Sequence, residues 1–294
     1  MNDPRPFSIR IYAAEGHSSG LRLIDKSGWE GLGAVCPKGR LSKSSNREEF
    51  SGSGVYILLG NEEHLLPSIY IGQAENLRRR LGQHFSQKDF WQQVIFFTTK
   101  KDPLNKSELQ FLESSLIRRA QNYRRCHLEN GNTPHEPPLS EVDKADAEGF
   151  LLEMLSVLPL LGVNEFEPLE EALEPSEKFQ MESKTYSATG FESSNGFVVC
   201  KGSRASHRVS ETGLNKGYEQ LRQELIEEEV LLPEGDQLVF QVDYEFRKAS
   251  PAAAILAGYN MNGLKSWKDA SGVTLSEYQK SSAAQMAGNE QESS

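Results

Sequence analysis

The sequence predicts a mixed α/β (α+β) protein: a small three-stranded antiparallel sheet flanked by helices, with an N-terminal β extension and a second small α+β domain. Three observations support this prediction. Short apolar runs bounded by glycine alternate with amphipathic helices over residues 51–167. An acidic stretch with two prolines follows at 168–190 and is typical of a linker. Strand and helix patterns then resume over 191–280.

Composition indicates a globular protein from a reducing compartment. The chain has 294 residues, 37% hydrophobic and 25% charged, enough for two domains with cores of their own. No apolar run approaches the ~20 residues of a membrane helix, and no signal peptide is visible. Cys36, Cys126 and Cys200 lie far apart, which argues against a disulfide framework and a zinc site. We therefore expect a cytoplasmic protein with no membrane partner.

The charge is distributed unevenly along the chain. The net charge is −10, yet residues 69–128 hold eleven Lys and Arg against five Asp and Glu, a local charge of +6. Residues 141–192 hold thirteen Asp and Glu against three Lys, a local charge of −10. A basic patch of this kind can neutralise phosphates, although it can equally be a solvated helix face.

The first elements are strands. Alternating apolar residues at 9–12 and 21–24 predict two half-exposed strands in the N-terminal β extension, residues 1–50. Two further apolar segments, 55–59 and 68–72, predict a pair of strands joined by a hairpin-like connection. Alternation turns their tyrosines, Tyr56 and Tyr70, away from the neighbouring aliphatic side chains. By themselves these residues also fit a plain cross-strand aromatic pair.

An amphipathic helix follows the second tyrosine. Its apolar stripe is predicted to consist of Leu77, Leu81 and Phe85. Arg80 and His84 fall on the flank of that stripe, whereas Arg78 and Arg79 turn outward. An arginine beside the core face could point a bidentate donor into a cleft, or it could belong to a solvated basic face.

A third strand, 91–98, and a second helix, 106–125, complete the predicted core. Asn105 and Glu108 have the spacing of a capping box at the start of that helix. Glu113 lies inside its apolar stripe, which consists of Leu109, Leu112, Leu116, Ile117 and Ala120. A carboxylate in such a stripe is costly unless it is paired, hydrogen-bonded or metal-bound. An ion pair with Arg80 and a metal site are equally compatible with the residues.

Several of these pieces together resemble the GIY-YIG nuclease family. The tripeptides Gly54-Val55-Tyr56 and Tyr70-Ile71-Gly72 match in order and spacing, as do Asn76-Leu77-x-x-Arg80-Leu81 and the later Glu113. The resemblance covers about 70 residues. It implies an endonuclease that hydrolyses DNA phosphodiester bonds with a single divalent cation, Mg²⁺ or Mn²⁺.

The resemblance also implies roles for individual residues. Tyr56 would be the general base, with its pKa lowered by the nearby cation, and Tyr70 would orient the water or phosphate. Arg80 would hold a phosphate oxygen, and Glu113 would be the only protein ligand of the metal. Some family members carry a lysine where this chain has Gln73. His84 is therefore a further catalytic candidate, although a histidine at a helix end is also commonly a surface or capping residue.

Candidate substrate-binding residues follow from the same resemblance. They are Gln73, Asn76, Arg78, Arg79 and Asn132. Asn132 belongs to an Asn-Gly-Asn-Thr-Pro segment, 130–134, which is also a plain turn signal.

The rest of the chain predicts a helix at 143–158, an edge strand at 160–163 and then the linker. The second domain is predicted to contain strands at 196–200 and 238–242, a helix at 218–232, and a helix opened by Ser250-Pro251. Segments 260–263, 267–269 and 272–275 resemble a small accessory domain of GIY-YIG nucleases, DUF4357, and the RAMA module. This resemblance implies either DNA or modified-base recognition, or a purely structural role. Trp267 is expected in the core, and 281–294 as a disordered tail.

Two classes of function follow. The first is a DNA endonuclease in restriction, phage defence or repair, with a homodimer and restriction, methylation or defence proteins as candidate partners. The alternative is a non-catalytic nucleic-acid-binding or interaction module that retains the fold. A phosphodiesterase for RNA or a small nucleotide is a third hypothesis.

Overall fold

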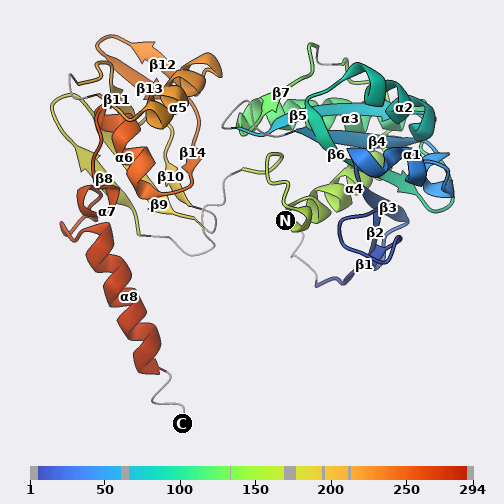
Figure 1. The fold of residues 1–294 in the computed structure, drawn as a ribbon, viewed down its shortest axis with the longest axis horizontal. Helices are drawn as coiled ribbons and strands as arrows, with labels where there is room; N and C mark the ends of the chain where they lie inside the picture. The colour runs from blue at the N-terminus through green and yellow to red at the C-terminus, as the bar shows by residue number, and fades with distance from the viewer. Residues whose placement is uncertain are drawn as a thin grey trace. The chain divides into compact units, whose positions relative to one another are not determined.

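The computed structural model describes residues 6–60, 66–132, 134–168, 177–193, 196–210 and 213–289. The chain divides into two compact units, Met1–Glu167 and Pro168–Ser294, which are drawn in Figure 1. Each unit has its own seven-stranded sheet and its own helices. Within the described ranges, no helix combines the length and apolar character needed to cross a membrane.

The sheet of the first unit has the strand order β1-β2-β3-β6-β4-β5-β7. Its strands are β1 (Ile9–Ala13), β2 (Arg22–Lys26), β3 (Gly31–Pro37), β4 (Gly54–Gly60), β5 (Ser68–Ala74), β6 (Trp91–Thr99) and β7 (His127–Leu128). The predicted three-stranded core is the antiparallel group β6-β4-β5. Antiparallel pairing of β3 with β6 adds the N-terminal strands to the same sheet. The N-terminal β extension is therefore part of the same sheet as the predicted core.

Helices cover both faces of this sheet. They are α1 (Leu41–Ser44), α2 (Leu77–Gln87), α3 (Lys106–Tyr123) and α4 (Glu141–Val157), with 3₁₀ turns η1 (Lys38–Arg40), η2 (Glu48–Phe50) and η3 (Pro159–Leu161). Val55 and Ile57 pack with α3 and α4 in one core cluster, whereas Tyr56 and Leu58 pack with α1 and α2 in the other. The predicted alternation along β4 is confirmed, and it places Tyr56 on the α2 face.

The capping of the two core helices follows the sequence. The Asn105 side chain accepts hydrogen bonds from backbone N–H groups at the start of α3, and the Asn105 backbone N–H donates to the Glu108 carboxylate, so the predicted capping box is present. The side chain of Asn76 accepts a hydrogen bond from the Arg79 backbone N–H and caps α2. Both caps fix the register of the helices that carry Arg80 and Glu113.

The predicted apolar stripe of α2 is wrong at its last position. Phe85 is 44% exposed, whereas His84 is only 3% exposed. At about 100° per residue, the eight-residue step from Leu77 drifts by about 80°. The seven-residue step to His84 drifts by only about 20°. The helix period therefore turns the imidazole, rather than the phenyl ring, toward the sheet.

The edge strand predicted at 160–163 is also wrong. Residues Pro159–Leu161 form the 3₁₀ turn η3, which continues directly from α4. Proline fits the first turn of a helical segment, and Gly162 ends the turn at a φ of 82°. Local backbone hydrogen bonds at 2.9 Å, from Leu161 to Leu158 and from Gly162 to Pro159, replace sheet pairing.

The second unit has the strand order β12-β13-β11-β9-β10-β14, with β8 paired to β9. Its strands are β8 (Phe179–Glu182), β9 (Ser187–Glu192), β10 (Phe197–Val199), β11 (Arg204–Ser206), β12 (Leu231–Glu234), β13 (Gln237–Phe240) and β14 (Tyr244–Phe246). Its helices are α5 (Lys216–Glu227), α6 (Ala249–Ala257), α7 (Gly263–Ser266) and α8 (Leu275–Asn289). Trp267 is fully buried and donates its Nε1–H to the Ala249 carbonyl at 3.2 Å, so its predicted core position is confirmed.

Four boundaries in this unit differ from the prediction. The predicted linker, 168–190, extends too far, because β8 and most of β9 lie inside it. The helix predicted at 218–232 ends at Glu227, since the apolar residues after it form β12 against β13. Helix α6 begins at Ala249 with Lys248 as N-cap, two residues before the predicted Ser250 cap. Most of the predicted disordered tail is helical, because α8 extends to Asn289.

Close packing of β4 against β5 and β6 accounts for the glycine in each motif tripeptide. A Cβ on Gly72 would lie 2.3 Å from the Tyr56 hydroxyl oxygen. A Cβ on Gly54 would lie 2.4 Å from the Phe97 carbonyl oxygen. Both distances are far inside van der Waals contact. The glycine of β5 is what lets the Tyr56 hydroxyl pass over its neighbouring strand.

This contact gives a stability prediction. Gly72→Ala is expected to lower the free energy of unfolding by about 1–3 kcal/mol, because the added methyl group must displace the Tyr56 phenol. Gly82→Ala is the matched control: no atom lies within 4 Å of that Cβ, and Gly82 is inside α2. The control should be stabilised by about 0.5–1 kcal/mol. Chemical denaturation of both variants measures the difference, and equal effects would contradict the packing argument.

Candidate active site

Two tyrosines and a histidine meet on the α2 face of the first sheet. The Tyr56 hydroxyl lies 2.7 Å from Nε2 of His84, and both residues are buried. The Tyr56 and Tyr70 rings are stacked with centroids 6.4 Å apart. The Tyr70 ring meets the imidazole edge-on at 5.2 Å. Strands β4 and β5 and helix α2 thus each contribute one ring to a single cluster.

Arg80 adds a cation to this cluster. It is one turn before His84 on α2, and its Nε–H donates to the Tyr56 hydroxyl oxygen at 3.2 Å. Its charge also interacts with the Tyr70 phenol. Its Nη1 donates to Oε1 of Gln83 at 3.2 Å, so the half-buried guanidinium is held from both sides. The arginine therefore lies beside both phenols.

The hydrogen bonds assign the proton positions. Burial, with help from the nearby Arg80 and Lys88 charges, lowers the pKa of His84 to about 4, so the imidazole is neutral at pH 7. Because Arg80 donates to the Tyr56 oxygen, the phenol proton is free to be donated to Nε2 of His84. We assign this tautomer from the hydrogen-bond network. In the described part of the chain, the buried Nδ1 of His84 has no partner.

The protein's own groups raise the pKa of Tyr56, whereas the lowering that the family resemblance implies would come from a bound cation. Burial raises this pKa, the neighbouring Tyr70 raises it further, and the hydrogen bond from Arg80 only partly offsets these effects. The expected lowering by a nearby cation is therefore not what the protein's own charges produce. At neutral pH the phenol keeps its proton, and its hydrogen-bonded proton acceptor is His84.

Glu113 comes to the same site from α3. Burial raises its pKa to about 7, although the Arg80 charge and a hydrogen bond from the Gln73 backbone both act to lower it. Its charge in turn raises the pKa of Tyr56. Gln73 directly follows the glycine of the second motif tripeptide, so β5 positions both Tyr70 and the amide that contacts Glu113.

Glu113 suits a hard divalent cation. Among the residues that the structure describes, no group of three or more His, Cys, Asp or Glu gathers at one point. A cation here would have one carboxylate ligand and would keep most of its waters, which is how Mg²⁺ is commonly bound. A bound cation would also offset the burial that now raises the carboxyl pKa.

Lys88 is part of the site and was not identified from the sequence. Its Nζ lies 4.3 Å from the centroid of the Tyr70 ring, and its charge helps to lower the pKa of His84. Lys88 brings a cation next to Tyr70, whereas Gln73 brings none. The signal that could have identified it is the four-residue spacing of Arg80, His84 and Lys88. It was hidden because Lys88 lies just beyond the last turn of α2.

Three of the predicted substrate-binding residues lie at or near the start of α2, and two of them make structural hydrogen bonds. Asn76 is exposed and caps α2, and it also donates to the Ser51 carbonyl at 3.3 Å. Arg78 donates to two backbone carbonyls of the segment before β4, those of Ser45 and Arg47. Arg79 is exposed on α2.

Asn132 is exposed, and its neighbour Asn130 is the asparagine that contacts the site strand. The Asn130 side chain accepts from the Ile71 backbone N–H at 2.9 Å and donates to the Ile71 carbonyl at 2.8 Å. This pair of bonds continues the short parallel pairing of β5 with β7. The sequence did not identify Asn130 as the residue that binds the Ile71 backbone, because the turn signal at 130–134 does not indicate which asparagine points toward β5.

Comparison with family models finds one match in each of the two units of the chain. The GIY-YIG catalytic domain model matches residues 52–119, which include Tyr56, Tyr70, Arg80, His84 and Glu113. Residues 52–119 form a GIY-YIG domain. A second family model, DUF4357, a domain of unknown function, matches residues 179–279. No curated protein and no solved structure matches the chain at a significant level.

These matches confirm the two resemblances found in the sequence. The GIY-YIG domain has a nuclease-type fold, and its motif strands are β4 and β5 of the first unit. The DUF4357 domain coincides with the sheet and helices of the second unit. The resemblance of that unit to the RAMA module stays a prediction.

The raised pKa of Glu113 predicts a pH-dependent stability. A carboxyl group whose pKa rises on folding, here from 4.5 to about 7, contributes stability below pH 4.5 that is lost as the pH rises to 7. The Glu113→Gln variant has no carboxyl group to titrate at this position, so it does not lose this stability as the pH rises. Relative to wild type, the variant should gain about 1–2 kcal/mol between pH 4.5 and 8, allowing for solvent screening of a half-buried group. Denaturant unfolding at several pH values measures the free energy of unfolding of both proteins. If it has the same pH dependence in wild type and in Glu113→Gln, the raised pKa of Glu113 is wrong.

Proposed function

We propose that the protein is a metal-dependent endonuclease that hydrolyses DNA phosphodiester bonds with one Mg²⁺ or Mn²⁺. The observation that supports it is the hydrogen-bonded cluster of Tyr56, His84 and Arg80, with Tyr70 and Glu113, inside a GIY-YIG domain. In this cluster the phenol and imidazole can act as a general base, and the guanidinium can bind phosphate. The carboxylate can bind the metal. The basic stretch at 69–128 suits a polyanionic substrate.

The base in this proposal is the Tyr56–His84 pair rather than a free tyrosinate. A water that donates to the Tyr56 oxygen loses its proton to that oxygen while the phenol proton moves to Nε2 of His84. The resulting hydroxide attacks phosphorus, and the bond from phosphorus to the leaving oxygen breaks. The neutral imidazole with a pKa of about 4 is ready to accept at neutral pH. It holds the proton only briefly, because its conjugate acid is strong.

The remaining residues stabilise charge. Arg80 would release part of its contact with Tyr56 to hold a non-bridging phosphate oxygen, as a fork-shaped donor can. Lys88 would keep His84 neutral and add positive charge beside Tyr70. When bound at Glu113, the cation would supply the positive charge that the leaving oxygen needs. One such site per chain would cut one strand at a time.

The first test is cleavage. With Mg²⁺ and supercoiled plasmid, Glu113→Ala and Arg80→Ala are each expected to slow nicking by at least about 100-fold, since each removes charge stabilisation in the transition state. Binding of duplex DNA should persist in Glu113→Ala. Asp102→Asn, an exposed carboxylate in the loop before α3, is the control and should cleave normally.

Two outcomes would favour other functions. If wild-type protein binds DNA but does not cut it with either Mg²⁺ or Mn²⁺, the chain is a binding module that retains the fold. If single-stranded RNA or a small nucleotide diester is cut and plasmid is not, the substrate assignment is wrong while the chemistry stands.

The second test concerns His84 through the groups that face it, namely Tyr56, Tyr70, Arg80 and Lys88. Removing the Lys88 charge should raise the pKa of His84, because a nearby cation disfavours imidazolium. At saturating Mg²⁺, which keeps Glu113 ionised, the acidic limb of the pH profile of kcat/KM should then move to higher pH in Lys88→Gln but stay in place in Lys88→Arg. Lys101→Gln, a 74% exposed side chain elsewhere, is the matched control. An unshifted limb in Lys88→Gln would exclude His84 as the acceptor.

A further inference from the structure

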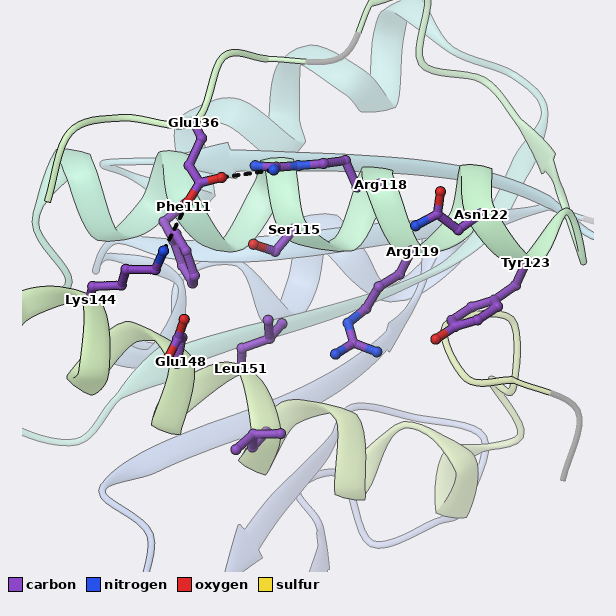
Figure 2. Close-up of a pocket in the computed structure, with 11 residues that line it drawn as sticks. Phe111, Ser115, Arg118, Arg119, Asn122, Tyr123, Glu136, Lys144, Glu148 and Leu151 are labelled. Atoms are coloured by element: carbon purple, nitrogen blue, oxygen red, sulfur yellow. Dashed lines mark hydrogen bonds and ion pairs between the residues drawn. The ribbon is translucent and has the colours of Figure 1, made fainter. Parts of the chain in front are cut away.

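A pocket of about 550 Å³ lies between α3 and α4, and Figure 2 shows the side chains around it. Its walls come from one face of each helix and from Glu136 in the segment that joins them. Phe111 and Tyr123 are aromatic residues near the two ends of the α3 side, and Leu151 contributes apolar surface from α4. The volume is in the range of small-molecule sites.

Most of the charge around this pocket is already paired. One carboxylate oxygen of Glu136 accepts a hydrogen bond from Nη1 of Arg118 at 2.7 Å. Lys144 approaches its other oxygen at 3.6 Å. The Glu136 carboxylate therefore forms ion pairs with both Arg118 and Lys144, at one end of the pocket (Figure 2).

Arg119 is the exception. It is half-buried, and in the described part of the chain it makes no hydrogen bond or ion pair. In Figure 2 its guanidinium extends between the two helices, with Tyr123 to one side and Leu151 to the other. Glu148 is the other unpaired charge, but it is exposed on α4. With three cations and two carboxylates, the pocket has a net charge of +1.

The pocket is on the side of α3 away from the hydrolytic site. At about 100° per residue, Ser115 and Asn122 lie about 200° and 180° around the helix from Glu113. Both line the pocket. Arg119 lies about 240° around the helix from Glu113, so a different side of α3 supplies this arginine from the one that supplies the candidate metal ligand. A ligand here would not compete directly for the hydrolytic centre.

We propose that this pocket binds a phosphate group of a nucleotide, with Arg119 as its main contact. A guanidinium that has no protein partner can make bidentate hydrogen bonds to a phosphate, and Asn122 and Ser115 add side-chain donors next to it. Tyr123 and Phe111 offer aromatic surface to a base. The phosphate belongs either to a nucleic-acid strand or to a free nucleotide. The first source rests on the proposed function, whereas the second does not.

Binding to the full-length Glu113→Gln protein tests the proposal without cleavage. Anisotropy with labelled 20-nucleotide single-stranded and duplex DNA, over a series of salt concentrations, measures strand binding. Calorimetry with inorganic phosphate and with a deoxynucleoside monophosphate measures free-ligand binding. The added variants are Arg119→Gln, which keeps most of the side-chain stem, and Asn122→Asp, which puts a carboxylate at an exposed helix position. Lys101→Gln is the control for loss of one positive charge.

If the site holds a strand, Arg119→Gln should weaken DNA binding about tenfold and lower the salt slope by about one, and Asn122→Asp should weaken it in the same direction. If the site holds a free nucleotide, saturable monophosphate binding should be lost in both variants while DNA binding is unchanged. Either result supports a phosphate site. Unchanged binding of every ligand in both variants, or equal losses in Lys101→Gln, would overturn it. The monophosphate result stands even if the protein cleaves no nucleic acid.

Discussion

The hydroxyl of Tyr56 is the point on which the candidate active site depends. It is buried in the sheet, passes over Gly72 of the neighbouring strand, contacts His84 at 2.7 Å and receives the Nε–H of Arg80 at 3.2 Å. A buried phenol needs hydrogen-bond partners, because leaving it without them would cost roughly 1–3 kcal/mol. Helix α2 provides both partners from successive turns. The same hydrogen bonds that stabilise the fold therefore position the groups that would act on a phosphate.

Burial sets the protonation states around this hydroxyl. It raises the pKa of Tyr56 and Glu113 and lowers that of His84, so all three shifts favour the neutral forms. Arg80 is then the permanent charge closest to the phenol, and Lys88 adds a second cation at Tyr70. A site with neutral acids and bases beside fixed cations is suited to an anionic substrate, because the substrate's charge can replace the missing carboxylate charge.

Helix α3 divides the first unit into two chemically different regions. Its Glu113 side lies toward Gln73 of β5, and the Glu113 charge acts on Tyr56. Its Arg119 side meets α4 around a pocket of about 550 Å³. The helix can serve both because it is capped by Asn105 and Glu108 and buried along its apolar stripe. The seven-stranded sheet beneath it, extended by the N-terminal strands, provides a rigid base for both regions.

Local sequence determined the elements whose pattern is short and strong. The alternation along β4, the capping box of α3, the burial of Trp267 and both family resemblances were all predictable, because each depends on a few neighbouring residues. The inward turn of His84 in place of Phe85 still follows from the helix period. Tertiary structure decided the rest. The residues after Glu227, in contrast, form β12 because they pair with β13. The positions of Lys88 at Tyr70, of Asn130 at Ile71 and of Arg119 between α3 and α4 are likewise set by contacts between distant segments. A one-dimensional pattern records which face a residue prefers, but only the folded chain fixes which charges and hydrogen-bond partners it meets there.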